Sequence, residues 1–187
     1  MKLNIDDYPV VKEHLLSFGK DRLEQTGKPG ARKKTSNKWF ETQDSISYWE
    51  DFSKQKIVWK RIGSVLRFSY DESGAFCLDS TCFATGKDLK FLLGYLNSTV
   101  SKIELLNNSP KTGTGDVITS VQALEPLYIP NADESQKQKI VTLVDQCINA
   151  LSRGNTDISA FEEAIDMEIF KLFYLTEEEI KYLKKDF

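Results

Sequence analysis

Strand-forming patterns are confined to the middle of this 187-residue chain. Residues 56–62, KIVWKRI, are rich in β-branched residues and alternate in the manner of a strand. Residues 64–85 are expected to form a hairpin that turns at DESG, where aspartate and glycine supply the turn chemistry. Residues 117–130 are expected to form a strand pair or an extended run. Because helical patterns flank these strands and do not alternate with them, the sequence predicts an α+β fold, with a β-rich core between an N-terminal helix and C-terminal helices.

Helical spacing of apolar residues recurs along the rest of the chain. It covers residues 8–25, 86–106, 133–152, 156–175 and 176–187. Asn97 and Ser98 are expected to loosen the second of these helices partway, and Ser135 is expected to cap the third. In the last segment Thr176 and Glu179 have the spacing of a capping box, which predicts a well-defined helix start.

The net charge of −3 hides an uneven distribution of charge. Between Lys12 and Arg67 there are 13 Lys and Arg against 7 Asp and Glu, a balance of +6. Residues 133–187 carry 7 against 12, a balance of −5. Clustered cations are typical of proteins that bind polyphosphate, although a charge run can also be only a solvated loop. We therefore predict two parts, a basic one over 1–132 and an acidic helical one over 133–187 that packs on the first or on a partner.

The motifs of several enzyme classes are absent. The chain has no G-x-S-x-G and no G-x-x-x-x-G-K-[ST], which excludes the usual triad hydrolases and P-loop NTPases. The segment TGTGD at 112–116 is interpreted as a loop whose small residues allow close approach to a phosphate. Asp71, Glu72 and Asp79 leave a metal-dependent nuclease open without showing its spacing. A self-contained enzyme is not expected.

The chain also carries signals about its compartment. It has no stretch of 18 or more apolar residues, and its first residues lack the features of a signal peptide. Cys77, Cys82 and Cys147 are odd in number and have no metal-binding spacing, so they are expected to be reduced thiols. A cytoplasmic protein with no membrane partner is predicted.

Five landmarks follow one another in an order known from one family. They are YPVVKEHLLSFGKDRLEQ with KWFETQ, then FSKQKIVWKRIG, FCLDSTCFATGKDLKFLLGYLNSTV, ALEPLYIPNADESQKQKIVTLVDQCI and AIDMEIFKLFYLTEEEIKYL. Together they resemble the TaqI-like C-terminal specificity domain, the target-recognition part of adenine-specific type II restriction–modification enzymes. The fourth landmark resembles a segment shared with type I specificity subunits. The resemblance covers nearly the whole chain.

This resemblance implies a module that recognises double-stranded DNA and positions a methyltransferase or endonuclease on its target site. The chain itself has only NSPK at 108–111 where an adenine methyltransferase has an Asn/Asp-Pro-Pro-aromatic motif, and no PD-(D/E)xK motif. S-adenosylmethionine and Mg²⁺ are therefore expected only in catalytic domains outside this chain, which is cut from a larger enzyme or encoded alone. Two alternatives stay open: a protein–protein adaptor whose basic loop meets an acidic partner, and a nuclease with an unrecognised metal site.

In such a module lysine and arginine neutralise phosphates, while a few side chains reach base edges in the major groove. The candidate DNA contacts are Lys28, Arg32, Lys33, Lys34, Asn37, Lys38, Gln43, Ser45 and Ser47 in segment 28–47, Lys60 and Arg61 at a strand end, and Lys111, Thr112 and Thr114 in loop 108–116. Trp39 is expected to pack its loop against the core, and Trp49 and Trp59 are assigned to the core itself.

Overall fold

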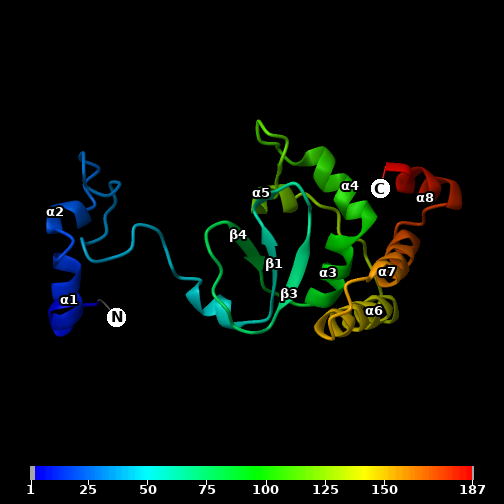
Figure 1. The fold of residues 1–187 in the computed structure, drawn as a ribbon, viewed down its shortest axis with the longest axis horizontal. Helices are drawn as coiled ribbons and strands as arrows, with labels where there is room; N and C mark the ends of the chain where they lie inside the picture. The colour runs from blue at the N-terminus through cyan, green and yellow to red at the C-terminus, as the bar shows by residue number, and fades with distance from the viewer. Residues whose placement is uncertain (1–2, 187) are drawn as a thin grey trace. The chain divides into compact units, whose positions relative to one another are not determined.

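The computed structural model describes residues 3–186, which form a mixture of helices and small antiparallel sheets. The expected α+β class is confirmed. The chain divides into two compact units, Met1–Glu50 and Asp51–Phe187, called here the N-terminal and C-terminal units. Figure 1 shows the elements of each unit in chain order. The predicted division at residue 132 stays a prediction.

The N-terminal unit is built from short helices and a long irregular segment. Its helices are η1 (Ile5–Asp7), α1 (Pro9–Leu16) and α2 (Lys20–Leu23). Pro9 stands at the first helical position, where its missing N–H costs nothing. The single helix expected over 8–25 is wrong, because Gly19 has φ +87° and turns the chain between α1 and α2. No regular element follows until η2 (Trp49–Ser53), and Trp49 is 56% exposed, so its assignment to the core is also wrong.

A three-stranded antiparallel sheet begins the C-terminal unit. Its middle strand is β1 (Lys56–Lys60), which pairs with β3 (Phe68–Asp71) on one side and β4 (Thr81–Ala84) on the other. The hairpin expected over 64–85 is therefore wrong, since its two strands never pair with each other. Residues 72–80 instead cross from one end of β1 to the other. Trp59 on β1 is buried, as its sequence position predicted.

A second, smaller sheet joins two distant segments. In it β2 (Ile62–Gly63) pairs with β5 (Val117–Ile118). Only two residues of the extended run expected over 117–130 are therefore strand, and α5 (Val121–Leu124) follows them. This pairing brings loop 108–116 beside the end of β1.

The remaining helices are α3 (Leu89–Asn97), α4 (Thr99–Asn108), α6 (Glu134–Ser152), α7 (Ser159–Leu172), α8 (Glu177–Leu183) and η3 (Lys184–Asp186). Ser98 is extended and separates α3 from α4, as the expected loosening indicated. Asp133 caps α6 in a capping box with Gln136, so the prediction of Ser135 as cap is wrong. The capping box at the start of α8 is confirmed. None of the helices within residues 3–186 is both long and apolar enough to cross a membrane.

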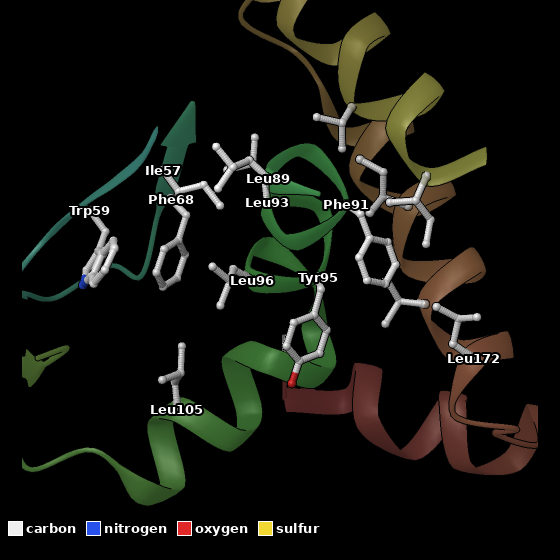
Figure 2. Close-up of a cluster of buried hydrophobic side chains, with 14 residues drawn as sticks. Ile57, Trp59, Phe68, Leu89, Phe91, Leu93, Tyr95, Leu96, Leu105 and Leu172 are labelled. Atoms are coloured by element: carbon white, nitrogen blue, oxygen red, sulfur yellow. The ribbon is translucent and has the colours of Figure 1, made fainter. Parts of the chain in front are cut away.

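Helix α3 lies at the centre of the C-terminal unit. Figure 2 shows Leu96 on the side of α3 that faces Phe68 of the sheet, while Phe91 points to the opposite side, toward α6 and α7. The hydroxyl of Tyr95 lies 3.4 Å from the carboxylate of Glu104 on α4. Gly94 lets α6 approach closely, because a Cβ there would lie 2.7 Å from Cγ2 of Ile140. Burial on both sides makes α3 the scaffold that fixes the sheet and its loops, and it raises the pKa of the Tyr95 phenol.

Candidate nucleic-acid interface

The basic segment, residues 26–47, is held by one buried side chain. Gln25 is 5% exposed, although it follows a short surface helix. Its Nε2 donates to the main-chain oxygens of Lys38 and Glu41, at 2.9 and 2.8 Å, and its Oε1 accepts from the hydroxyl of Thr35. One amide side chain thus ties three points of the segment to the end of α2. Satisfying buried polar groups in this way fixes a backbone that has little apolar packing.

Arg32 forms a second set of hydrogen bonds that hold the same segment. Its Nε donates to the main-chain oxygen of Leu23 at 2.8 Å, and one terminal N–H group donates to that of Trp39. The main-chain oxygen of Arg32 also accepts from N–H of Gly27 at 2.9 Å. A guanidinium has five donors in a rigid fork, and here two of its nitrogens hold backbone carbonyls. Arg32 was singled out as a DNA contact, but these bonds make it first a positioning residue. We call the bonds of Gln25 and Arg32 the Gln25–Arg32 anchor.

Four lysines project from the anchored segment. Lys28, Lys33, Lys34 and Lys38 are all exposed. Lys33 pairs with Asp44, and Nζ of Lys38 lies 5.3 Å from the ring centroid of Phe40. Ion pairs between exposed groups contribute little, so a phosphate could replace Asp44 at small cost. The anchor therefore presents a set of cations on a defined backbone.

The side chains of this segment that are predicted to contact bases differ in exposure and in their hydrogen bonds. Asn37 is exposed, and its Nδ2 donates to the main-chain oxygen of Thr42 at 2.8 Å. Gln43 is half-buried. The hydroxyls of Ser45 and Ser47 are exposed and lie 3.0 Å apart. Each of these stays a predicted contact.

The C-terminal unit carries a second set of cations around the small sheet. Lys60 and Arg61 are exposed at the end of β1, and N–H of Thr119 donates to the main-chain oxygen of Arg61 at 2.8 Å. Lys111, exposed, forms a bridge with Val117 next to β5. The structure thus brings together residues from two of the predicted groups, which lie about fifty positions apart in the chain.

Arg67 joins this second set, although no sequence pattern singles it out. A strand was expected at this position, but Arg67 lies in the connection between β2 and β3, where it is exposed. Within residues 3–185 neither Arg67 nor Lys60, Arg61 or Lys111 forms an ion pair. Unpaired cations around one small sheet are available to an anionic partner.

The glycine–threonine loop is closed by its own hydrogen bonds. The hydroxyls of Thr112 and Thr114 lie 2.8 Å apart, and N–H of Asp116 donates to Oγ1 of Thr112 at 3.0 Å. The carboxylate of Asp116 lies 3.4 Å from Oγ1 of Thr114 and would repel a phosphate there. The two threonines stay predicted contacts, and Lys111 is the better-placed group of this loop.

The helices of residues 133–187 have a different electrostatic character. Three of their lysines pair with carboxylates: Lys137 with Asp88 at 2.6 Å, Lys184 with Glu163 at 2.8 Å, and Lys171 with Glu168. Lys184 lowers the pKa of the Glu163 carboxyl. Asp166 on α7 accepts from N–H and the hydroxyl of Thr99, at 2.8 and 2.6 Å, and so caps α4 across the helix interface. The sequence contains no local signal for this cap, because the two residues lie 67 positions apart.

The nuclease alternative requires carboxylates grouped around a metal ion, and the structure shows where the carboxylates lie. Among the described residues, no three His, Cys, Asp or Glu side chains are grouped closely enough to hold a metal ion. Asp71 bonds to Lys56 and Ser73, and the Lys56 bond is the main cause that lowers its pKa. Cys82 is a free, half-buried thiol whose pKa burial raises. Asp71 thus has structural partners in Lys56 and Ser73.

Comparisons with known proteins agree with the landmarks in the sequence. The family model of the TaqI-like C-terminal specificity domain matches residues 4–129. Type II methyltransferase M.MjaIV of Methanocaldococcus jannaschii is 30% identical over 167 residues, which are 85% of this chain and 53% of the relative. The chain thus spans about half the length of the curated relative that it matches.

Proposed function

Because this chain belongs to the TaqI-like C-terminal specificity domain family, we propose that it is the sequence-specific DNA-recognition module of a restriction–modification enzyme. Its task is to bind duplex DNA at a short site and to position a methyltransferase or endonuclease part there. The match to a type II methyltransferase supports a methyltransferase part as the partner, and S-adenosylmethionine and Mg²⁺ belong to such catalytic parts. A cytoplasmic location, where the chromosome of a prokaryote lies, accords with this role.

The observation that carries the proposal is the set of exposed lysines on a segment fixed by the Gln25–Arg32 anchor. Lys28, Lys33, Lys34 and Lys38 each offer a point charge for a phosphate. A segment that is already ordered loses less conformational entropy when it binds. Phosphate contacts of this kind set the register of the module on the duplex but carry no sequence information.

Recognition of the DNA sequence requires side chains that can reach base edges. Asn37 offers the amide chemistry that pairs with adenine, and Arg61 offers the guanidinium that pairs with guanine. Both are exposed, and both stand next to lysines that would hold the backbone. This arrangement supports base readout beside phosphate contacts in each unit.

Selection from a random duplex pool tests the proposal directly. The full chain is incubated with the pool at low salt, bound duplexes are sequenced, and the affinity for the enriched site is measured against a scrambled duplex at several salt concentrations. We expect one enriched short site, with an affinity at least about tenfold above the scrambled duplex and falling steeply with salt. Absence of binding would favour the adaptor alternative, and cleavage of the duplex with Mg²⁺ would favour the nuclease.

A further inference from the structure

Three large apolar side chains stand exposed around the cations of the C-terminal unit. Leu78 is 79% exposed, and Val65 and Ile62 are also exposed. A single exposed apolar residue is common on protein surfaces and needs no explanation. Leu78 differs because it begins a turn that is hydrogen-bonded to the end of β1, where Lys60 and Arg61 lie.

Two hydrogen bonds fix the end of the crossing segment 72–80. N–H of Thr81 donates to the main-chain oxygen of Leu78 at 3.0 Å, and N–H of Arg61 donates to that of Ser80 at 2.9 Å. Thr81 is also the Cα partner of Lys60 across the sheet. The side chain of Leu78 therefore projects from a turn that is bonded to the strand end bearing two exposed cations. Farther back in the segment, the ring centroid of Phe76 lies 4.8 Å from that of Phe52 on η2, whose own ring lies 4.7 Å from that of Phe83 on β4. These ring contacts link the segment to the sheet.

The charges nearby indicate what would cover Leu78. Lys60 and Arg61 have no ion pair within residues 3–185, so an anionic surface is the natural neighbour. Asp79 is the carboxylate of this turn, and a carboxylate suits the amino group of a cytosine but not a phosphate. In the major groove the apolar feature between two rows of phosphates is the 5-methyl group of thymine.

We propose that Leu78 contacts the 5-methyl group of a thymine in the recognised duplex, while Lys60 and Arg61 hold phosphates beside it. This inference rests on the proposed function and adds a specificity-determining residue to it. Burying one methyl group against an apolar side chain is worth roughly a fourfold change in affinity.

The test replaces each thymine of the selected site by uracil, which removes only the methyl group. With the parent chain we expect one position at which uracil weakens binding about fourfold. With Leu78→Ser the same duplexes should bind equally, because the apolar contact is gone. Val10→Ser is the matched control, since Val10 is also 79% exposed but lies on α1, which contains none of the predicted contacts. That variant should keep the parent's discrimination.

Four results would overturn the inference. If no uracil position weakens binding, or if Leu78→Ser discriminates as well as the parent, Leu78 reads no methyl group. If uracil is neutral while 2-aminopurine in the site brightens on binding, Leu78 is inserted between bases instead. These three results leave the proposed function standing, because the site has been selected. Failure of the parent chain to select any site would overturn both.

Discussion

The two units of the molecule are stabilised in different ways. Among the described residues of the N-terminal unit, Ile5 is the buried apolar side chain, and α1 buries none of its residues. The C-terminal unit has a cluster of 14 buried apolar residues around α3. The N-terminal unit instead relies on the Gln25–Arg32 anchor. The lysines of the basic segment are exposed and it has little apolar packing, so its order comes from hydrogen bonds to its own backbone.

The largest expected effect is in the core of the C-terminal unit. Ile169 on α7 is fully buried, and Ile169→Ala should lower the free energy of unfolding by about 2–5 kcal/mol. Leu151→Ala on α6 is the control, because Leu151 is largely exposed and should change stability by less than about 0.5 kcal/mol. Urea denaturation measures both, and equal losses would show that the cluster around α3 is not the stabilising core.

Unlike a substitution in the core, a substitution in the Gln25–Arg32 anchor should loosen only the basic segment. Arg32→Lys keeps the charge but cannot hold the carbonyls of both Leu23 and Trp39, so it should leave buried acceptors unpaired at a local cost of about 1–3 kcal/mol. We expect faster amide hydrogen exchange throughout the basic segment and unchanged exchange in α3. Lys34→Arg is the control and should exchange like the parent. Parent-like exchange in Arg32→Lys would mean that the anchor does not order the segment.

A third prediction concerns the cap between helices. Asp166→Ala removes two hydrogen bonds to Thr99 at the start of α4, and should cost about 0.5–2 kcal/mol of unfolding free energy. Asp166→Asn keeps an acceptor and should lose less. Thermal unfolding of the two variants gives the difference. A larger loss for asparagine than for alanine would show that the hydrogen bonds are not what stabilises this position.

The smallest effect depends on pH. The Lys56 bond lowers the pKa of Asp71 in the folded state, so Asp71 stabilises the fold above its unfolded pKa of about 3.9. That stabilisation is lost as the pH falls through the lower folded pKa. Asp71→Asn should therefore be less stable than the parent at pH 7, and the difference should shrink below about pH 4. Glu72→Gln is the control, and a difference for Asp71→Asn that is constant with pH would contradict the assignment.

The sequence predicted some features that depend on neighbouring residues, although it misplaced the cap of α6 and missed the break at Gly19, and it did not predict those that depend on distant ones. The capping box of Thr176 and Glu179 is local, and its spacing alone identified it. The pairing of β3 and β4 with β1 depends on which strand fills the centre of the sheet, and adjacent strand patterns do not reveal that choice. The role of Gln25 was missed for the same reason, because its partners lie 10 to 16 residues away in a segment without periodicity.

The sequence also predicted where cations gather but not how they are used. Lys33 and Lys34 are exposed, whereas Arg32, which directly precedes them, turns inward to the backbone. Side-chain direction in an irregular segment is set by hydrogen bonds that only the folded backbone creates.

The salt dependence of DNA binding tests the central claim most directly, namely that the exposed lysines of the anchored segment neutralise phosphates. For the double variant Lys33→Ala with Lys34→Ala, the slope of log affinity against log salt should fall by roughly 1.8, about 0.9 for each lost contact. Binding to the selected and the scrambled duplex should weaken by the same factor. The double variant Lys12→Ala with Lys20→Ala, on α1 and α2, should keep the parent's slope. A parent-like slope in the Lys33/Lys34 variant would show that the DNA backbone is held elsewhere.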